Sequence, residues 1–210
     1  MVQLRMKIPT SCKDVKREAF AQPAVFLDRD GTINEQMGYI NNENRFILLK
    51  GAARAIRNLN RSGYLVVVVS NQSGVARGYF PLDLVYRVNL KLQDLLALEG
   101  AFVDAVYFCP HHERGIVPGF NQICDCRKPR IGLFNRACRE LPIDLSGSYV
   151  VGDRCLDIEF AERCGLPGIL VETGYGLGEK EWVLPSSSVK PVHVAEDLPA
   201  AVDWILGKKG

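Results

Sequence analysis

The sequence predicts an α/β fold in which a parallel β-sheet carries helices on both faces. Short apolar runs alternate with segments of helical periodicity, as in chains built from strand–helix–strand units. One of these runs, 65–69, holds only leucine and valine, which is typical of a central strand covered on both faces. Polar clusters follow four expected strands, at 28–31, 70–74, 109–128 and 152–157. Since ligands bind at the carboxyl ends of parallel strands, these clusters are expected to meet at one edge of the sheet.

The expected elements follow one another with little chain left over. A strand over 24–27 ends on Asp28, and a helix then runs from Gly51 to its glycine stop at Gly63. Pro81 suits the first turn of a helix that reaches Glu99. The remaining elements are strands at 65–69, 103–108, 148–151, 168–171 and 192–194, and helices at 131–141, 156–164 and 198–206. Neither 33–69 nor 74–127 leaves room for a large cap domain, so we expect a minimal cap and an open site.

Length and charge indicate one domain, at 23–210, preceded by a basic N-terminal arm at 1–22. The chain of 210 residues is long enough for one substantial core. The arm has an excess of three positive charges, whereas the rest is close to neutral and has no basic stripe that would suit nucleic acid. The sequence contains no membrane-length apolar stretch, and the arm lacks the apolar region of a secretory signal. We therefore expect a cytoplasmic monomer with neither a nucleic-acid nor a membrane partner.

The cluster after the first strand places two carboxylates, Asp28 and Asp30, two residues apart. If the chain leaves the strand in extended form, both side chains can enter one pocket. An aspartate can attack phosphorus and form an aspartyl-phosphate, while a second carboxylate protonates the leaving oxygen and then activates water. We assign these roles to Asp28 and Asp30 respectively. The alternative is a turn or helix cap, in which Asp and Gly are frequent.

Two further acids and two polar residues complete a predicted phosphoryl-transfer site. Asp153 and Asp157 follow a later strand. Because Mg²⁺ prefers oxygen ligands and keeps several waters, Asp28, Asp153 and the backbone carbonyl of Asp30 would suffice to bind it. Asp157 is either a further ligand, a nearby hydrogen-bond acceptor or the cap of the following helix. Ser70 and Lys128 are the candidates for stabilising the phosphoryl group.

A Cys3His set in the third cluster predicts a zinc site. Its four members lie within 18 residues and are Cys109, His111, Cys124 and Cys126. Thiolate and imidazole are the usual ligands of tetrahedral Zn²⁺. Since all four positions are filled by protein, the ion has no place for a catalytic water. We therefore expect structural zinc that staples an otherwise irregular loop.

The clusters together resemble the haloacid dehalogenase (HAD) superfamily of phosphatases, whose four motifs occur here in order. Asp28-x-Asp30-Gly-Thr, Ser70, Lys128 and Gly-Asp153-x-x-x-Asp157 match motifs I to IV. The resemblance implies a Rossmann-like sheet. It also implies Mg²⁺ bound through Asp28, Asp30 and Asp153, with Ser70 and Lys128 stabilising the phosphoryl group.

Three segments narrow the resemblance to the D-glycero-D-manno-heptose 1,7-bisphosphate 7-phosphatase family, in the histidinol-phosphatase-like subfamily. They are 71–78, 109–112 and 124–129. That family removes one phosphate from a small sugar bisphosphate. By resemblance the substrate contacts are Gln36, Met37, Gly38, Tyr39, Asn71, Gln72, Ser73, Arg127 and Arg154. Arg127 also suits a second phosphate on physical grounds, since a guanidinium can bind it bidentately.

Three other functions stay open at this point: a histidinol-phosphate phosphatase, another small sugar-phosphate phosphatase, and a phosphate-binding module without turnover. Histidinol-phosphate phosphatases share motif I, the zinc loop and the Cys-Arg-Lys-Pro sequence, and they commonly have arginine where the heptose enzymes have lysine after the motif IV aspartate. Arg154 is therefore a departure from the heptose pattern. The segment 73–78 and the longer zinc loop favour the heptose enzymes. A phosphate-binding module without turnover would share the acidic pocket but would leave Asp30 without a role.

Overall fold

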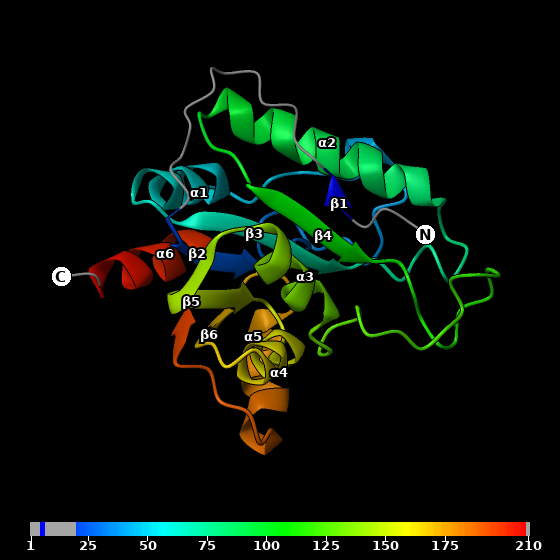
Figure 1. The fold of residues 1–210 in the computed structure, drawn as a ribbon. Helices are drawn as coiled ribbons and strands as arrows, with labels where there is room; N and C mark the ends of the chain where they lie inside the picture. Colours follow the sequence, from blue (N-terminus) through cyan, green and yellow to red (C-terminus); the bar gives the residue numbers. More distant parts are fainter. Residues whose placement is uncertain (1–4, 7–19, 209–210) are drawn as a thin grey trace.

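The computed structural model describes residues 5–6 and 20–208, and within them the strands form one seven-stranded sheet (Figure 1). The strands stand in the order β1-β4-β3-β2-β5-β6-β7. Their bounds are β1 (Arg5–Met6), β2 (Gln22–Leu27), β3 (Leu65–Asn71), β4 (Ala105–Cys109), β5 (Ile143–Gly152), β6 (Gly168–Val171) and β7 (His193–Ala195). Strands β2 to β7 pair in parallel, as predicted, whereas β1 pairs antiparallel with β4. The rest of the predicted arm up to residue 19 lies outside the described residues.

The helices lie close to their predicted positions. They are α1 (Ala52–Arg61), α2 (Leu82–Leu98), α3 (Gly132–Glu140), α4 (Cys155–Arg163), α5 (Gly176–Gly178) and α6 (Leu198–Gly207), with short turns η1 (Glu43–Arg45), η2 (Glu179–Val183) and η3 (Leu184–Ser186). The turns over 176–186 were not predicted, since glycine and proline interrupt any apolar period there. Strand β5 is also longer than predicted, because Ile143 and Asp144, in a segment with few apolar residues, pair with Gln22 and Pro23 at the start of β2. No helix in the described part of the chain is long and apolar enough to cross a membrane.

The sheet is covered on both faces, which confirms the predicted fold class. Along β2, Val25 and Leu27 belong to the core cluster shared with α1, α2 and α6. The intervening Ala24 and Phe26 belong to a second cluster shared with α3 and α4. Successive side chains of a strand point to opposite faces, so the unbroken apolar runs are explained by these two layers. Figure 1 shows the two groups of helices on either side of the sheet.

The register of the central strands brings the polar clusters together. Leu27 of β2 pairs with Val68 of β3 and with Val151 of β5, so these three strands end side by side. Asp28 continues the ladder, because its N–H donates to the carbonyl of Val151 at 2.9 Å. Between β2 and β4 the described chain forms η1, α1, β3 and α2 and no separate domain. The carboxyl edge of the sheet is therefore left open.

Candidate active site

A cleft of about 210 Å³ opens at the carboxyl ends of β2, β3 and β5. Most of the site residues that we predicted line it: Asp28, Asp30, Gln36, Gly38, Tyr39, Ser70, Asn71, Ser73, Arg127, Lys128, Asp153, Arg154 and Asp157. Leu156 and Tyr175 line it as well and were not predicted. Two predicted substrate contacts, Met37 and Gln72, are not among the lining residues. Met37 packs against the core, and Gln72 is buried behind Ser70, to whose hydroxyl its side-chain amide donates.

Lys128 stands between two carboxylates in the floor of the cleft. Its Nζ lies 2.7 Å from Asp28 Oδ1 and 2.6 Å from Asp157 Oδ1. Burial alone would lower the pKa of Lys128, but the charges of Asp157 and Asp28 raise it well above its ordinary value. Burial raises the pKa of Asp28 to about 6, an effect that Lys128 opposes and Asp157 reinforces. The result is a fixed cation beside the Asp28 carboxylate, whose other oxygen, Oδ2, receives no hydrogen bond from the described residues.

Asp30 lies in different surroundings, because the side chain of Arg29 folds back onto it. Arg29 is almost fully buried, and its Nη2 lies 2.9 Å from Asp30 Oδ2. Asn34 and Gln72 also donate to this carboxylate, at 3.0 and 2.7 Å. Burial raises the pKa of Asp30, but Arg29 and these hydrogen bonds outweigh it and hold the pKa below its usual value. These contacts favour the ionised form of Asp30 and hold its carboxylate in one orientation.

Asp153 is packed tightly between two glycines at the end of β5. A Cβ added to Gly31 would lie 2.1 Å from Asp153 Oδ2, and one added to Gly174 would lie 2.2 Å from it. The same oxygen accepts the N–H of Tyr175 at 2.8 Å. The other oxygen, Oδ1, is buried and has no protein partner among the described residues. Burial and the charges of Asp28 and Asp157 raise the pKa of Asp153 to about 8.

This acidic cluster fits a divalent cation with oxygen ligands. Asp28, Asp153 and Asp157 each bring a carboxylate oxygen within 4.8 Å of the others. Three carboxylates this close repel one another unless a proton or a cation lies between them. Both oxygens of Asp157 already have partners, Lys128 Nζ and the Arg154 N–H. The unpartnered Asp153 Oδ1 and the neighbouring Asp28 are therefore better placed to receive a cation than Asp157.

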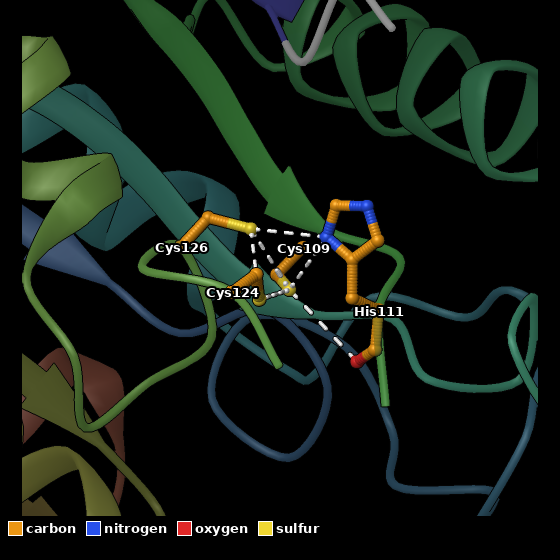
Figure 2. Close-up of side chains that lie close together, drawn as sticks. All are labelled: Cys109, His111, Cys124 and Cys126. Carbon is orange, nitrogen blue, oxygen red and sulfur yellow. Dashed lines mark hydrogen bonds between the residues drawn. The ribbon is translucent and has the colours of Figure 1, made fainter. Parts of the chain in front are cut away.

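The second candidate metal centre lies where β4 ends, and Figure 2 shows its four side chains converging. The sulfur atoms of Cys109, Cys124 and Cys126 lie 3.1–3.5 Å apart, and His111 Nδ1 lies 3.3 Å from Cys126 Sγ. A tetrahedral site with zinc–sulfur bonds of about 2.3 Å has edges of about 3.8 Å, so a small expansion of the cluster would accommodate Zn²⁺. The hydrogen bond with Cys126 raises the pKa of Cys109, and the same bond lowers the pKa of Cys126 to about 6.

The Cys3His loop is joined directly to the cleft. Arg127 and Lys128 follow Cys126 without a break, and both line the cleft. The segment is then tied to β3, because Asn71 exchanges two hydrogen bonds with the backbone of Lys128, at 3.0 and 3.2 Å. The position of Lys128 Nζ beside Asp28 therefore depends on how the loop is held.

The residues that support the site but were missed from sequence include Arg29, Asn34, Thr173, Tyr175 and Glu179. A signal for Arg29 did exist, since an arginine between two acids of a buried loop must pair with one of them. No sequence signal pointed to Thr173, Tyr175 and Glu179, because they lie in a segment after β6 that contains no recognisable motif. Thr173 Oγ1 donates to the carbonyl of Gly31 at 2.6 Å, and Glu179 accepts from the N–H of Cys155 at 3.0 Å. The loop after β6 thus holds the ends of both β2 and β5.

Comparison with known proteins first defines the class. The HAD-hydrolase-like family model matches residues 125–201. The crystal structure of D,D-heptose 1,7-bisphosphate phosphatase from B. bronchiseptica, complexed with magnesium and phosphate, superposes with a TM-score of 0.77 at 32% identity, covering 89% of this chain and 99% of that one. With the cleft described above, these matches define a phosphatase of the HAD class.

Curated relatives then identify the family within that class. A D-glycero-D-manno-heptose-1,7-bisphosphate 7-phosphatase from Thermosynechococcus vestitus is 44% identical over 188 residues, which cover 88% of this chain and 95% of the relative. A D-glycero-beta-D-manno-heptose-1,7-bisphosphate 7-phosphatase from Escherichia coli K12 is 39% identical, over 86% and 93% of the two chains. The chain belongs to the D-glycero-D-manno-heptose-1,7-bisphosphate 7-phosphatase family.

Proposed function

We propose that this protein hydrolyses the 7-phosphate of D-glycero-D-manno-heptose 1,7-bisphosphate through an aspartyl-phosphate intermediate on Asp28. The observation that carries the proposal is the Asp28 carboxylate in the floor of an open cleft, 2.7 Å from the Lys128 ammonium. A carboxylate beside a fixed cation can attack a phosphoryl group whose charge that cation neutralises. Relatives that carry this activity by name match most of the chain.

Asp28 attacks phosphorus in line with the leaving oxygen, while Lys128 and the Ser70 hydroxyl stabilise the equatorial oxygens. Asp30 gives a proton to the leaving oxygen and then accepts one from the water that hydrolyses the aspartyl-phosphate. The lowered pKa of Asp30 suits the second step, in which its carboxylate accepts a proton. For the first step it must carry a proton, and the negative charge of an incoming phosphate favours that protonation.

Two metal ions complete the proposal. Asp28, Asp153 and the backbone carbonyl of Asp30 would hold Mg²⁺, which supplies charge neutralisation at the transferring group when bound. Asp157 then serves as the acceptor that orients Lys128 and caps α4, since both of its oxygens are engaged there. Zn²⁺ in the Cys3His loop would be structural, because four protein ligands complete its coordination. The cytoplasmic location, the monomeric state and the single-domain boundaries at 23–210 stay predictions.

Replacing the nucleophile tests the chemistry. Asp28→Asn should reduce phosphate release by at least about 10³-fold, since the amide cannot form the acyl-phosphate. The fold should persist, as the change removes a buried charge and keeps the shape of the side chain. The control Asp203→Asn makes the same change on the exposed face of α6. Phosphate release and circular-dichroism melting are measured on both, and near-wild-type turnover by Asp28→Asn would refute the assignment.

A substrate panel tests the specificity. Rates are compared on heptose 1,7-bisphosphate, other sugar bisphosphates, histidinol phosphate and a generic aryl phosphate. We expect the highest kcat/KM on the heptose bisphosphate. A clear preference for histidinol phosphate would overturn the substrate and leave the chemistry intact. Complete absence of phosphate release from every compound would favour a binding module.

A further inference from the structure

The guanidinium of Arg154 is held at the cleft by two groups that the sequence did not reveal. Its Nε donates to Glu179 Oε1 at 3.2 Å, and its Cζ lies 5.3 Å from the centre of the Tyr175 ring. The Arg154 side chain is 51% exposed, whereas that of Glu179 is only 12% exposed. Within residues 5–6 and 20–208, no acceptor is recorded for the terminal Nη groups of Arg154. The anchored guanidinium therefore keeps its forked edge free.

Glu179 is itself fixed in place. Its second carboxylate oxygen, Oε2, accepts the N–H of Cys155 at the first turn of α4, at 3.0 Å. Tyr175 is fixed as well, because its backbone N–H donates to Asp153. The segment 173–179, which we name the clamp segment, thus bonds to Asp153 and to Arg154 directly. A guanidinium held this way loses little conformational freedom when it binds an oxyanion, so more of the interaction is realised as affinity.

The positions of the other cationic side chains in the cleft indicate what Arg154 binds. Three lining residues are cationic: Arg127, Lys128 and Arg154. Lys128 already pairs with Asp28 and Asp157 in the floor. Arg127 and Arg154 can therefore bind an anion outside the reacting centre. The planar guanidinium of an arginine can donate hydrogen bonds to two phosphate oxygens at once.

We propose that Glu179 is a positioning residue, which with Tyr175 aims Arg154 at the phosphate that is not hydrolysed. The inference rests on the proposed function, because only a bisphosphate brings a second phosphate to the cleft. Glu179 does not touch the substrate in this arrangement. It acts by presenting the Nη edge of Arg154 in one orientation, and so sets the preference for a bisphosphate over a monophosphate.

The test compares a bisphosphate with an aryl phosphate that has no second anion. For Glu179→Ala we expect KM for heptose 1,7-bisphosphate to rise about tenfold at nearly constant kcat, as for one weakened charge-assisted hydrogen-bond pair. Turnover of p-nitrophenyl phosphate by this variant should stay within about twofold of wild type. Glu179→Gln, which keeps an acceptor oxygen, should recover part of the loss. Arg154→Ala and the double variant Glu179→Ala/Arg154→Ala should show the same KM on the bisphosphate, since Glu179 acts through Arg154.

Glu181→Ala is the matched control, because it removes an exposed acid two residues away for which the described part of the chain provides no ion pair. If Glu179→Ala lowers turnover of both substrates alike together with the melting temperature, Glu179 only caps α4 and the inference is wrong. If the increases in KM caused by Glu179→Ala and Arg154→Ala add up in the double variant, the inference is also wrong. Wild-type enzyme that turns over p-nitrophenyl phosphate but no bisphosphate would refute the proposed function and this inference together. If the wild-type enzyme hydrolyses the bisphosphate but Glu179→Ala leaves KM unchanged, this inference is refuted and the proposed function is not.

Discussion

Asp28 and Asp30 lie in one loop, yet their surroundings move their pKa values in opposite directions. Burial dominates at Asp28 and raises its pKa to about 6. At Asp30 burial also raises the pKa, but the charge of Arg29 and the hydrogen bonds from Asn34, Arg29 and Gln72 together outweigh it and lower the pKa. A pair of acids whose pKa values are driven apart is the usual basis for giving them different tasks. Here the difference depends on the buried Arg29 and on the amides of Asn34 and Gln72, which contact Asp30 and not Asp28.

Arg29→Met should therefore destabilise the protein in a pH-dependent way. Arg29 also donates to Asn89 Oδ1 at 2.8 Å, so the change strips two buried groups of a partner. Breaking such a pair costs about 3 kcal/mol at pH 7. Because the folded pKa of Asp30 lies below its ordinary 3.8, its carboxylate contributes stability above that pH, which is lost as the pH falls through the folded pKa. The wild-type advantage should thus be full at pH 7 and shrink below about pH 4.

Urea unfolding of both proteins across pH 3–7 measures this difference. Arg163→Met serves as the control, since its ion pair with Glu159 is exposed and should contribute less than about 1 kcal/mol. A loss of stability in Arg29→Met that stays constant with pH would contradict the pairing with Asp30.

Among the elements, the clamp segment packs closely against the site. Gly174 adopts a φ of +60°, and a Cβ there would lie 2.2 Å from Asp153 Oδ2 and 2.6 Å from the Cα of Gly31. Neither neighbour is the end of a flexible surface chain. Asp153 would have to move, and with it the carboxylate oxygen that we assign to the cation.

Gly174→Ala should therefore lose activity out of proportion to stability. Gly165 offers a matched control, because its φ of +69° imposes the same backbone strain with nothing within 4 Å of an added Cβ. Both alanine variants should lose about 1 kcal/mol of stability from the left-handed backbone, and Gly174→Ala should lose roughly 1–3 kcal/mol more, because its Cβ also overlaps Asp153 and the Gly31 backbone. Only Gly174→Ala should also lose at least about tenfold in kcat/KM and bind Mg²⁺ more weakly, as misplacement of a charged ligand predicts. Equal activities of the two variants would show that Asp153 tolerates the shift.

The Cys3His loop is the second element whose structure determines the geometry of the site, because Arg127 and Lys128 follow it directly. Removing the zinc that we propose for this loop should leave three close sulfur atoms without a cation and release the segment that ends in Arg127 and Lys128. With a zinc-selective chelator and excess Mg²⁺ we expect a lower melting temperature, faster alkylation of Cys126 and at least about tenfold slower phosphate release. Cys138→Ala, outside the set, should keep its zinc content. Unchanged melting temperature and rate after complete zinc removal would refute the structural role.

At the scale of the whole molecule, the parallel sheet and the convergence of its polar clusters were predictable from sequence. They follow from local patterns, namely the apolar runs and the polar residues after them, together with the one geometry that parallel strands allow. Arg29 packing onto Asp30, or Glu179 reaching the first turn of α4, depends instead on contacts between distant segments. No periodicity encodes such contacts, and the turns over 176–186 carry no motif. Strand β1 was missed for the same reason, since its pairing with β4 is a long-range contact of two residues.

The position of β1 leads to a prediction about the N-terminal arm. Arg5 and Met6 pair with Tyr107 and Val106, within β4, and β4 is otherwise the edge of the sheet. Every residue that lines the cleft lies at Asp28 or beyond. A chain that starts at Phe20 keeps all of β2, so its kcat/KM on an aryl phosphate should stay within about twofold of the full chain.

The same truncation uncovers the backbone N–H and C=O groups of β4, and an exposed edge of this kind favours association between chains. We therefore expect the shortened protein to scatter more light at high concentration while retaining its zinc and its activity. A charged substitution on that edge, such as Val106→Lys, would not be a suitable way to prevent this association, because the side chain of Val106 is fully buried in the core. Loss of turnover in the monomeric fraction of the truncated protein would instead mean that the arm takes part in the site.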